Sequence, residues 1–104
     1  RIYIEGLDQE TNAFAKKRFA EKNIYVISND QEHADFIIKF SLVSTGLVHF
    51  TGYADFIKNN DIVYTTKSVN SHFSTNHTGL FNYRDGVVDK LINRRIYPFY
   101  KPKN

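Results

Sequence analysis

Cysteine, methionine and tryptophan are all absent from the 104 residues of this chain. Without cysteine, the protein can form neither a disulfide framework nor a metal site built on thiolates. No apolar run approaches the roughly 20 residues that a membrane-spanning helix needs. The five glycines are separated from one another, so a glycine-rich phosphate loop is also absent. Disulfide-based, thiolate-based and phosphate-loop chemistry are therefore excluded.

Charge of one sign is also scarce, because 14 lysines and arginines are balanced by 11 acidic residues to give a net charge of +3. The basic residues are scattered rather than gathered into a stripe, so we expect no nucleic-acid partner. With 41% hydrophobic and 24% charged residues, the composition is that of an ordinary globular protein. The length fits a single domain covering residues 1–104.

Aromatic residues are abundant, with nine Phe and seven Tyr. Aromatic and β-branched side chains favour the pleated, half-buried surface of a sheet. We therefore expect strands to supply most of the core.

The first part of the chain predicts a strand, a helix and a second strand. Alternating isoleucines form a short strand that ends at Gly6. Asp8 is a suitable N-cap for a helix that continues to Lys22, and Asn23 ends it. Residues 24–27 predict another short strand before a polar loop.

The middle of the chain predicts three longer strands, over residues 36–43, 47–57 and 62–73. The polar residues 58–61 predict a hairpin turn between the last two. Apolar and polar side chains alternate along these strands, as expected for antiparallel strands covered by helices on one face. The expected core-facing residues include Phe36, Ile38, Phe40, Leu42, Val48, Phe50, Ala54 and Phe56.

The last part predicts a second helix, beginning at Leu80 or Asp85 and continuing to Ile96. Pro98 is expected to end it, and residues 97–104 to form a tail or an extended edge segment. The predicted fold class is α+β. It consists of a single, mainly antiparallel sheet with two helices on one face, in the order β-α-β-β-β-β-α.

Catalytic and metal-binding patterns are not found among the polar residues. The four histidines do not have the compact spacing of zinc ligands; they are His33, His49, His72 and His77. Four aspartates could form an acid–base pair in space, but each suits a turn or a strand position; they are Asp30, Asp35, Asp55 and Asp61. Three serines flank His72 without a nucleophile-turn motif; they are Ser68, Ser71 and Ser74. We expect no enzyme, no cofactor and no metal site, unless His72 or His77 meets an acid in a cleft.

A partner surface is the better candidate. The polar face of the sheet predicts such a surface, and its residues are His49, Thr51, Tyr53, Tyr64 and Thr66. A smaller basic cluster follows at the end of the second helix, where it complements the helix dipole or meets an anionic surface; its residues are Arg94, Arg95, Lys101 and Lys103.

Several segments together resemble a known group of proteins. They are residues 2–4, the helical Phe14-Ala15-Lys16-Lys17-Arg18-Phe19, the strand Ala34-Asp35-Phe36-Ile37-Ile38, a glycine-containing hairpin, and a last helix running into Tyr97-Pro98. The chain resembles the small bacterial cell-envelope lipoproteins of unknown function. It is more distantly similar to the lipopolysaccharide-assembly lipoprotein that plugs an outer-membrane barrel. Two features depart from these groups: the lipidated cysteine is absent, and the hairpin between Gly46 and Ile62 is short for the assembly protein.

The resemblance implies a periplasm-facing domain, anchored to the outer membrane by a lipid outside residues 1–104, with an envelope protein as partner. Because the chain opens at Arg1 directly in a strand, we expect a leader or linker to have preceded it. The expected function is non-enzymatic protein interaction or envelope assembly through the outer sheet face or an exposed edge strand. The alternative is a small-ligand or lipid-binding module. Its pocket would lie between sheet and helices, lined by Phe36, Phe40, Phe50 and Phe56.

Overall fold

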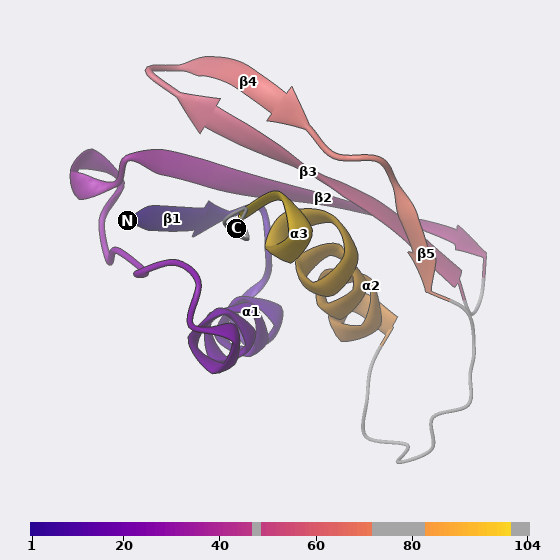
Figure 1. Cartoon of the computed structure of the whole chain (residues 1–104). Helices are drawn as coiled ribbons and strands as arrows, with labels where there is room; N and C mark the ends of the chain where they lie inside the picture. Colours follow the sequence, from indigo (N-terminus) through magenta and orange to yellow (C-terminus); the bar gives the residue numbers. More distant parts are fainter. Residues whose placement is uncertain (47–48, 72–82, 101–104) are drawn as a thin grey trace.

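A computed structural model describes residues 1–46, 49–71 and 83–100 of the chain. A twisted sheet forms one layer, and helices cover one of its faces (Figure 1). The elements are β1 (Ile2–Glu5), α1 (Gln9–Lys22), the 3₁₀ turn η1 (Gln31–His33), β2 (Phe36–Gly46), β3 (His49–Lys58), β4 (Asp61–Thr65), β5 (Val69–Ser71), α2 (Tyr83–Leu91), a π-helical turn (Ile92–Ile96) and α3 (Tyr97–Tyr100).

The five-stranded sheet is mixed. Strand β1 runs parallel to β2, whereas β2 and β3 are antiparallel. Strand β3 then pairs with β4 near one end and with β5 near the other. The α+β class is confirmed, but the sheet is mixed rather than mainly antiparallel. The reason is that the chain crosses over through α1 and enters β2 in the direction of β1.

Helix α1 begins and ends where the sequence predicts. The carboxylate of Asp8 accepts a hydrogen bond from the backbone N–H of Thr11 at 2.8 Å. At the other end Asn23 has a φ of 57°, the left-handed conformation that ends helices. Thr11, Ala15 and Phe19 form its buried face.

The prediction of a strand over residues 24–27 is wrong. Only a single parallel bridge, between Ile2 and Ile27, forms in this segment. Ile24 is buried, Tyr25 and Ile27 pack against the core from partly buried positions, and Val26 is 63% exposed. The backbone hydrogen bonds that join this segment to β1 run from Ile2 to Val26 and from Ser28 to Ile2, so both involve Ile2 and the pairing is a bridge.

The single strand predicted over residues 62–73 is divided into β4 and β5. At the division, the backbone N–H of Ala54 donates to Thr66 Oγ1 at 3.0 Å rather than to a main-chain carbonyl. The backbone N–H of Thr66 donates in turn to the carbonyl of Ala54 at 2.9 Å. A side chain thus takes a place in the ladder and interrupts the strand. The strand predicted over residues 24–27 does not form, but the strand predicted over residues 62–73 forms as two. The order of elements therefore still reads β-α-β-β-β-β-α up to α2.

The second predicted helix begins at Tyr83 as α2, and helical structure continues past Pro98. The ring of a helical proline clashes with the carbonyl four residues earlier. Here a π-helical turn precedes Pro98, and the backbone N–H of Tyr97 donates to the carbonyl of Ile92, five residues back. The wider turn moves the backbone past the clash. The predicted tail or edge segment is therefore wrong for residues 97–100, which are helical, and residues 101–104 lie outside the described part.

The core lies between the sheet and the helices. It contains Ile2, Ile4, Ala15, Phe19, Ile24, Ile38, Phe40, Ala54, Phe56, Val69, Val87, Val88, Leu91, Ile92 and Ile96. Gly52 lets α2 approach β3 closely, because a Cβ at this position would lie 2.6 Å from Leu42 Cδ2 and 2.6 Å from Val87 Cγ1. An ion pair of 3.0 Å between Arg18 Nε and Asp89 Oδ1 also joins α1 to α2.

Candidate functional site

Of the five residues predicted as a partner surface, the four whose side chains the structure describes do not lie together. Thr51 and Tyr53 lie on the sheet face that the described helices leave uncovered. Tyr64 lies on the other face, since it is opposite Phe56 in the ladder and the two rings meet edge-on with centroids 5.6 Å apart. Thr66 is 4% exposed and engaged with Ala54. The side chain of His49 lies outside the described part.

A β-bulge explains why Tyr64 lies on the opposite face of the sheet from the predicted one. The register between β3 and β4 shifts between Phe56 and Ile57, so that Phe56 faces Tyr64 while Ile57 faces Ile62. Val63 is the extra residue. Because side chains alternate between faces, one extra residue reverses every assignment beyond it. Ile62 consequently lies on the uncovered face, beside Ile57.

The uncovered face carries one polar and one apolar row across the sheet. The ladder places the polar row in the order Glu5, Lys39, Asp55 and Thr65. It places the apolar row in the order Tyr3, Ile37, Ile57 and Ile62. Several polar side chains are already paired across strands. Thr65 Oγ1 donates to Asp55 Oδ1 at 2.6 Å, and Thr51 Oγ1 donates to Asn70 Oδ1 at 2.6 Å. The apolar row leads to the edge strand β4.

Two of the sheet's edges are covered. At β1, the backbone N–H of Ile2 donates to the carbonyl of Val26 at 2.9 Å, and that of Ser28 donates to the carbonyl of Ile2 at 2.7 Å. Beside β5, Lys90 Nζ donates to the carbonyl of Asn70 at 2.5 Å, and Arg95 Nη2 donates to the carbonyl of Ser68 at 3.3 Å. Helical side chains therefore occupy backbone acceptors that an added strand would need.

The edge at β4 differs from these two. Within residues 1–46, 49–71 and 83–100, only β3 pairs with this strand. Its five residues are all exposed. Three consecutive apolar side chains stand there, Ile62 at 61%, Val63 at 55% and Tyr64 at 36% exposure. A row of backbone donors and acceptors beside exposed apolar side chains is the usual template for strand addition.

The hairpin turn holds this edge in place. Asn59 and Asn60 both have positive φ, 54° and 67°, between the paired residues Lys58 and Asp61. Two successive left-handed residues are typical of the tight two-residue turn whose twist matches that of the strands. The predicted turn over residues 58–61 is thus confirmed, and it presents β4 as a fixed strand.

A shallow depression of about 420 Å³ lies at the tip of the same hairpin. Its lining residues are Gln31, Glu32, Ala34, Asp35, Phe36, Ile37, Ile57, Asn59 and Asn60. Ile37 and Ile57 belong to the apolar row, so the row and the depression form one continuous surface that adjoins the start of β4.

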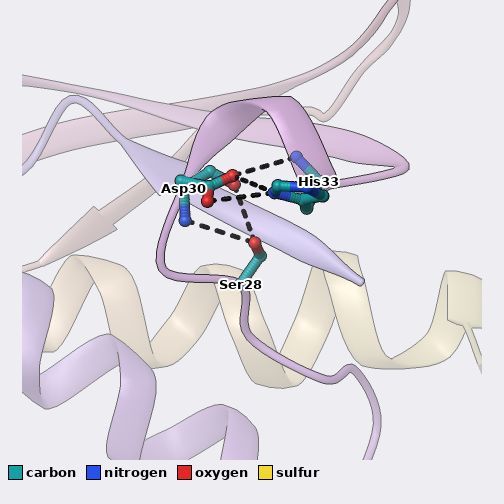
Figure 2. A network of polar contacts seen from close by, with 3 residues as sticks. All are labelled: Ser28, Asp30 and His33. Carbon is teal, nitrogen blue, oxygen red and sulfur yellow. Dashed lines mark hydrogen bonds and ion pairs between the residues drawn. The ribbon is translucent and has the colours of Figure 1, made fainter.

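A polar cluster at η1 brings Ser28, Asp30 and His33 together (Figure 2). Ser28 Oγ donates to the carbonyl of Asp30 at 2.7 Å. The Asp30 carboxylate accepts from the backbone N–H of His33 at 3.0 Å and lies 2.8 Å from His33 Nδ1. The hydrogen bonds from the His33 side chain and backbone lower the pKa of Asp30 below its ordinary value of 3.8. The serine hydroxyl contacts backbone and not imidazole, so the cluster caps η1 and does not form a nucleophile–base pair.

The other candidates for chemistry remain separate. Asp55 bonds to Thr65, Asp35 lies 2.9 Å from the ammonium group of Arg1, and Asp61 belongs to the hairpin turn. His72 and His77 lie outside the described part, so their meeting with an acid stays a prediction. Among the described residues, no group of three or more His, Cys, Asp or Glu side chains is arranged to hold a metal ion.

The four phenylalanines of the expected ligand pocket pack into the protein. Phe40 and Phe56 are 1% and 2% exposed within the core, and Phe36 and Phe50 pack against it. The rings of Phe36 and Phe56 meet edge-on, with centroids 6.2 Å apart. These side chains contribute to the core around them.

Comparison with known proteins gives no match, either to a protein-family model or to a curated protein. In the described part of the chain, no helix has the length and apolar character needed to cross a membrane.

Proposed function

We propose that this protein is a non-enzymatic interaction domain that binds an extended segment of a partner protein as an added strand beside β4. The supporting observation is the contrast between edges. Hydrogen bonds cover β1 and β5, while β4 presents Ile62, Val63 and Tyr64 on a strand that only β3 pairs within the described residues. Strand addition uses backbone hydrogen bonds for affinity and alternate side chains for specificity.

The partner belongs, in this proposal, to a bacterial cell envelope. Support comes from the resemblance of the chain to small envelope lipoproteins. The full-length gene product should then incorporate labelled palmitate and fractionate with the outer membrane of its native cell. An unlabelled product in the cytoplasmic fraction would contradict the envelope assignment. It would not test whether β4 binds an added strand.

The binding edge is tested by two matched lysine substitutions. Val63 on β4 and Val43 on the uncovered face are each 55% exposed, so neither change disturbs the core. Val63→Lys places a charge in the middle of the added-strand interface and should reduce capture of envelope proteins roughly ten-fold or more. Val43→Lys should leave capture unchanged.

Hydrogen exchange gives a second readout. Captured partner should slow exchange of the β4 amides, because they become hydrogen-bonded. If Val43→Lys abolishes capture while Val63→Lys does not, the outer sheet face is the binding surface and the edge proposal is wrong.

A further inference from the structure

We propose that the depression at the tip of the β3–β4 hairpin is a binding site for a neutral sugar residue. Its volume of about 420 Å³ lies within the range of roughly 300–1,000 Å³ that is typical of small-ligand sites. The site goes beyond the strand addition proposed at β4 and does not depend on it. Its side chains combine hydrogen-bonding groups with an aliphatic floor, which matches the hydroxyl groups and the C–H surface of a sugar ring.

Four side chains with planar amide or carboxylate groups line the depression and are free to bind a ligand. They are Gln31, Glu32, Asn59 and Asn60, and all four are exposed. In the part of the chain that the structure describes, no hydrogen bond or ion pair engages these side chains. An amide both donates and accepts hydrogen bonds, and a carboxylate accepts several. A sugar hydroxyl needs both kinds of partner, because it donates one hydrogen bond and accepts others.

An aliphatic floor lies beside these polar groups. Ile37 on β2 and Ile57 on β3 are paired across the ladder, and both side chains line the depression. Both residues are partly buried, so the surface they leave open is a short apolar strip. The C–H face of a sugar ring fits such a strip, since apolar surface is then removed from water on both sides of the contact.

Both walls of the depression are ordered by contacts of their own. On one side, the Asp30 carboxylate accepts the backbone N–H of His33 at 3.0 Å and caps the η1 turn (Figure 2). On the other side, Asn59 and Asn60 occupy the left-handed region that the tight hairpin turn requires. A site whose backbone is already ordered loses less conformational entropy when a ligand binds. The polar cluster at η1 thus positions one wall of the site.

The charges around the depression favour a neutral ligand over an ion. The described lining residues include no Lys or Arg, so an anion finds no counter-charge among them. Of the two acids, Asp35 already bonds to the ammonium group of Arg1 at 2.9 Å, and the charge of Lys58 also acts on it. Glu32 then remains to attract a cation. It is exposed, and a single ion pair in solvent contributes little.

Titration with single sugars tests the site. Glucose, galactose, mannose and N-acetylglucosamine are added separately to isotope-labelled protein, and amide chemical shifts are followed by NMR. At least one sugar should bind in a saturable way, with a dissociation constant on the order of 1 mM, because an open site exchanges hydrogen bonds to water for hydrogen bonds to protein. The shifts should be confined to η1, the start of β2 and the hairpin turn. The methyl glycoside of the best-binding sugar then distinguishes a free sugar from a residue of a longer glycan, since only the second tolerates the added methyl group.

Two exposed glutamines provide a matched pair of variants. Gln31 is the first residue of η1 and lines the depression, whereas Gln9 is the first residue of α1 and does not. Gln31→Ala should weaken sugar binding roughly three- to ten-fold, and Gln9→Ala should leave it unchanged. Asn60→Gly should weaken it to a similar degree, because glycine keeps the left-handed turn while the amide group is lost.

Glu32→Gln separates a sugar from a cation. The amide keeps an acceptor and adds donors, so sugar binding should change by less than about two-fold. Spermidine is the cationic probe in the same titration, and it should produce no saturable shifts at the depression. Circular dichroism melting of each variant verifies that it is folded.

Four results would overturn the inference. They are the absence of saturable shifts with all four sugars, shifts centred away from the depression, equal losses from Gln31→Ala and Gln9→Ala, or binding of spermidine that Glu32→Gln abolishes. Val63 does not line the depression, so Val63→Lys should leave sugar binding unchanged. If Val63→Lys abolishes protein capture and no sugar binds, the proposed function stands and this site fails. If a sugar binds and Val63→Lys leaves capture intact, this site stands and the β4 edge fails.

Discussion

Thr66 shows how much one side chain can decide in this protein. Its hydroxyl accepts the backbone N–H of Ala54, while its own N–H bonds to the carbonyl of the same residue. It is 4% exposed, so water cannot replace these bonds readily. A buried amide that loses its acceptor costs more than an average hydrogen bond contributes.

Replacing Thr66 by valine keeps the shape of the side chain and removes the acceptor. We expect the free energy of unfolding to fall by about 1–3 kcal/mol, measured by urea denaturation. The control is Thr65→Val, which removes an exposed bond to Asp55. Equal losses from the two variants would show that the interrupted ladder does not depend on the Thr66 hydroxyl.

At the scale of elements, helix α2 and strand β3 depend on one glycine. Gly52 is buried in the middle of β3, where Leu42 and Val87 approach from the neighbouring strand and from α2. A residue without a side chain is therefore needed at the contact between the two layers. The same strand carries β4 at one end and β5 at the other, so its position also sets the proposed binding edge.

Gly52→Ala should destabilise the protein by roughly 1–3 kcal/mol, since the added methyl group overpacks the contact. Combining it with Val87→Ala should cost less than the sum of the two single changes, because the smaller helix residue makes room. Thermal unfolding of the four proteins in this cycle measures the coupling. Strict additivity would mean that β3 and α2 do not meet at Gly52 in solution.

At the scale of the whole molecule, carboxylates act on stability in opposite directions. The bonds from Thr11 lower the pKa of Asp8, and those from His33 lower the pKa of Asp30. Burial, followed by the nearby charge of Asp8, raises the pKa of Asp85. The first two groups stabilise the fold above their ordinary value of 3.8, and this contribution is lost as the pH falls through their lowered pKa values. Asp85 contributes in the reverse sense, because its protonated form is favoured in the folded state.

The contribution of Asp85 is fully present below 3.8 and is lost as the pH rises through its raised folded pKa. At neutral pH its ionised form therefore lowers stability. Asp85→Asn should raise the urea midpoint at pH 7 and flatten the stability profile between pH 4 and pH 7. Asp30→Asn should lower the midpoint at pH 7 and reduce the loss of stability below pH 4, because the ionised carboxylate no longer contributes. A profile for Asp85→Asn that parallels the wild type would contradict the assigned pKa direction.

Local pattern determined much of this molecule. Alternation along β2 and β3 gave their core-facing residues correctly, Asp8 and Asn23 gave the limits of α1, and Asn59-Asn60 gave the hairpin turn. Each of these depends on residues adjacent in the chain, whose conformational preferences can be predicted without knowledge of their tertiary contacts. The α+β class followed from the same patterns.

Tertiary structure alone decided the remainder. The parallel pairing of β1 with β2, the bulge that separates Ile62 from Tyr64, and the open edge at β4 all depend on strands distant in sequence. A bulge leaves no mark in the composition of the strand that carries it, and an edge exists only once the other strands are placed. The predicted partner surface was therefore divided between two faces, and the candidate binding edge became visible only in the folded sheet.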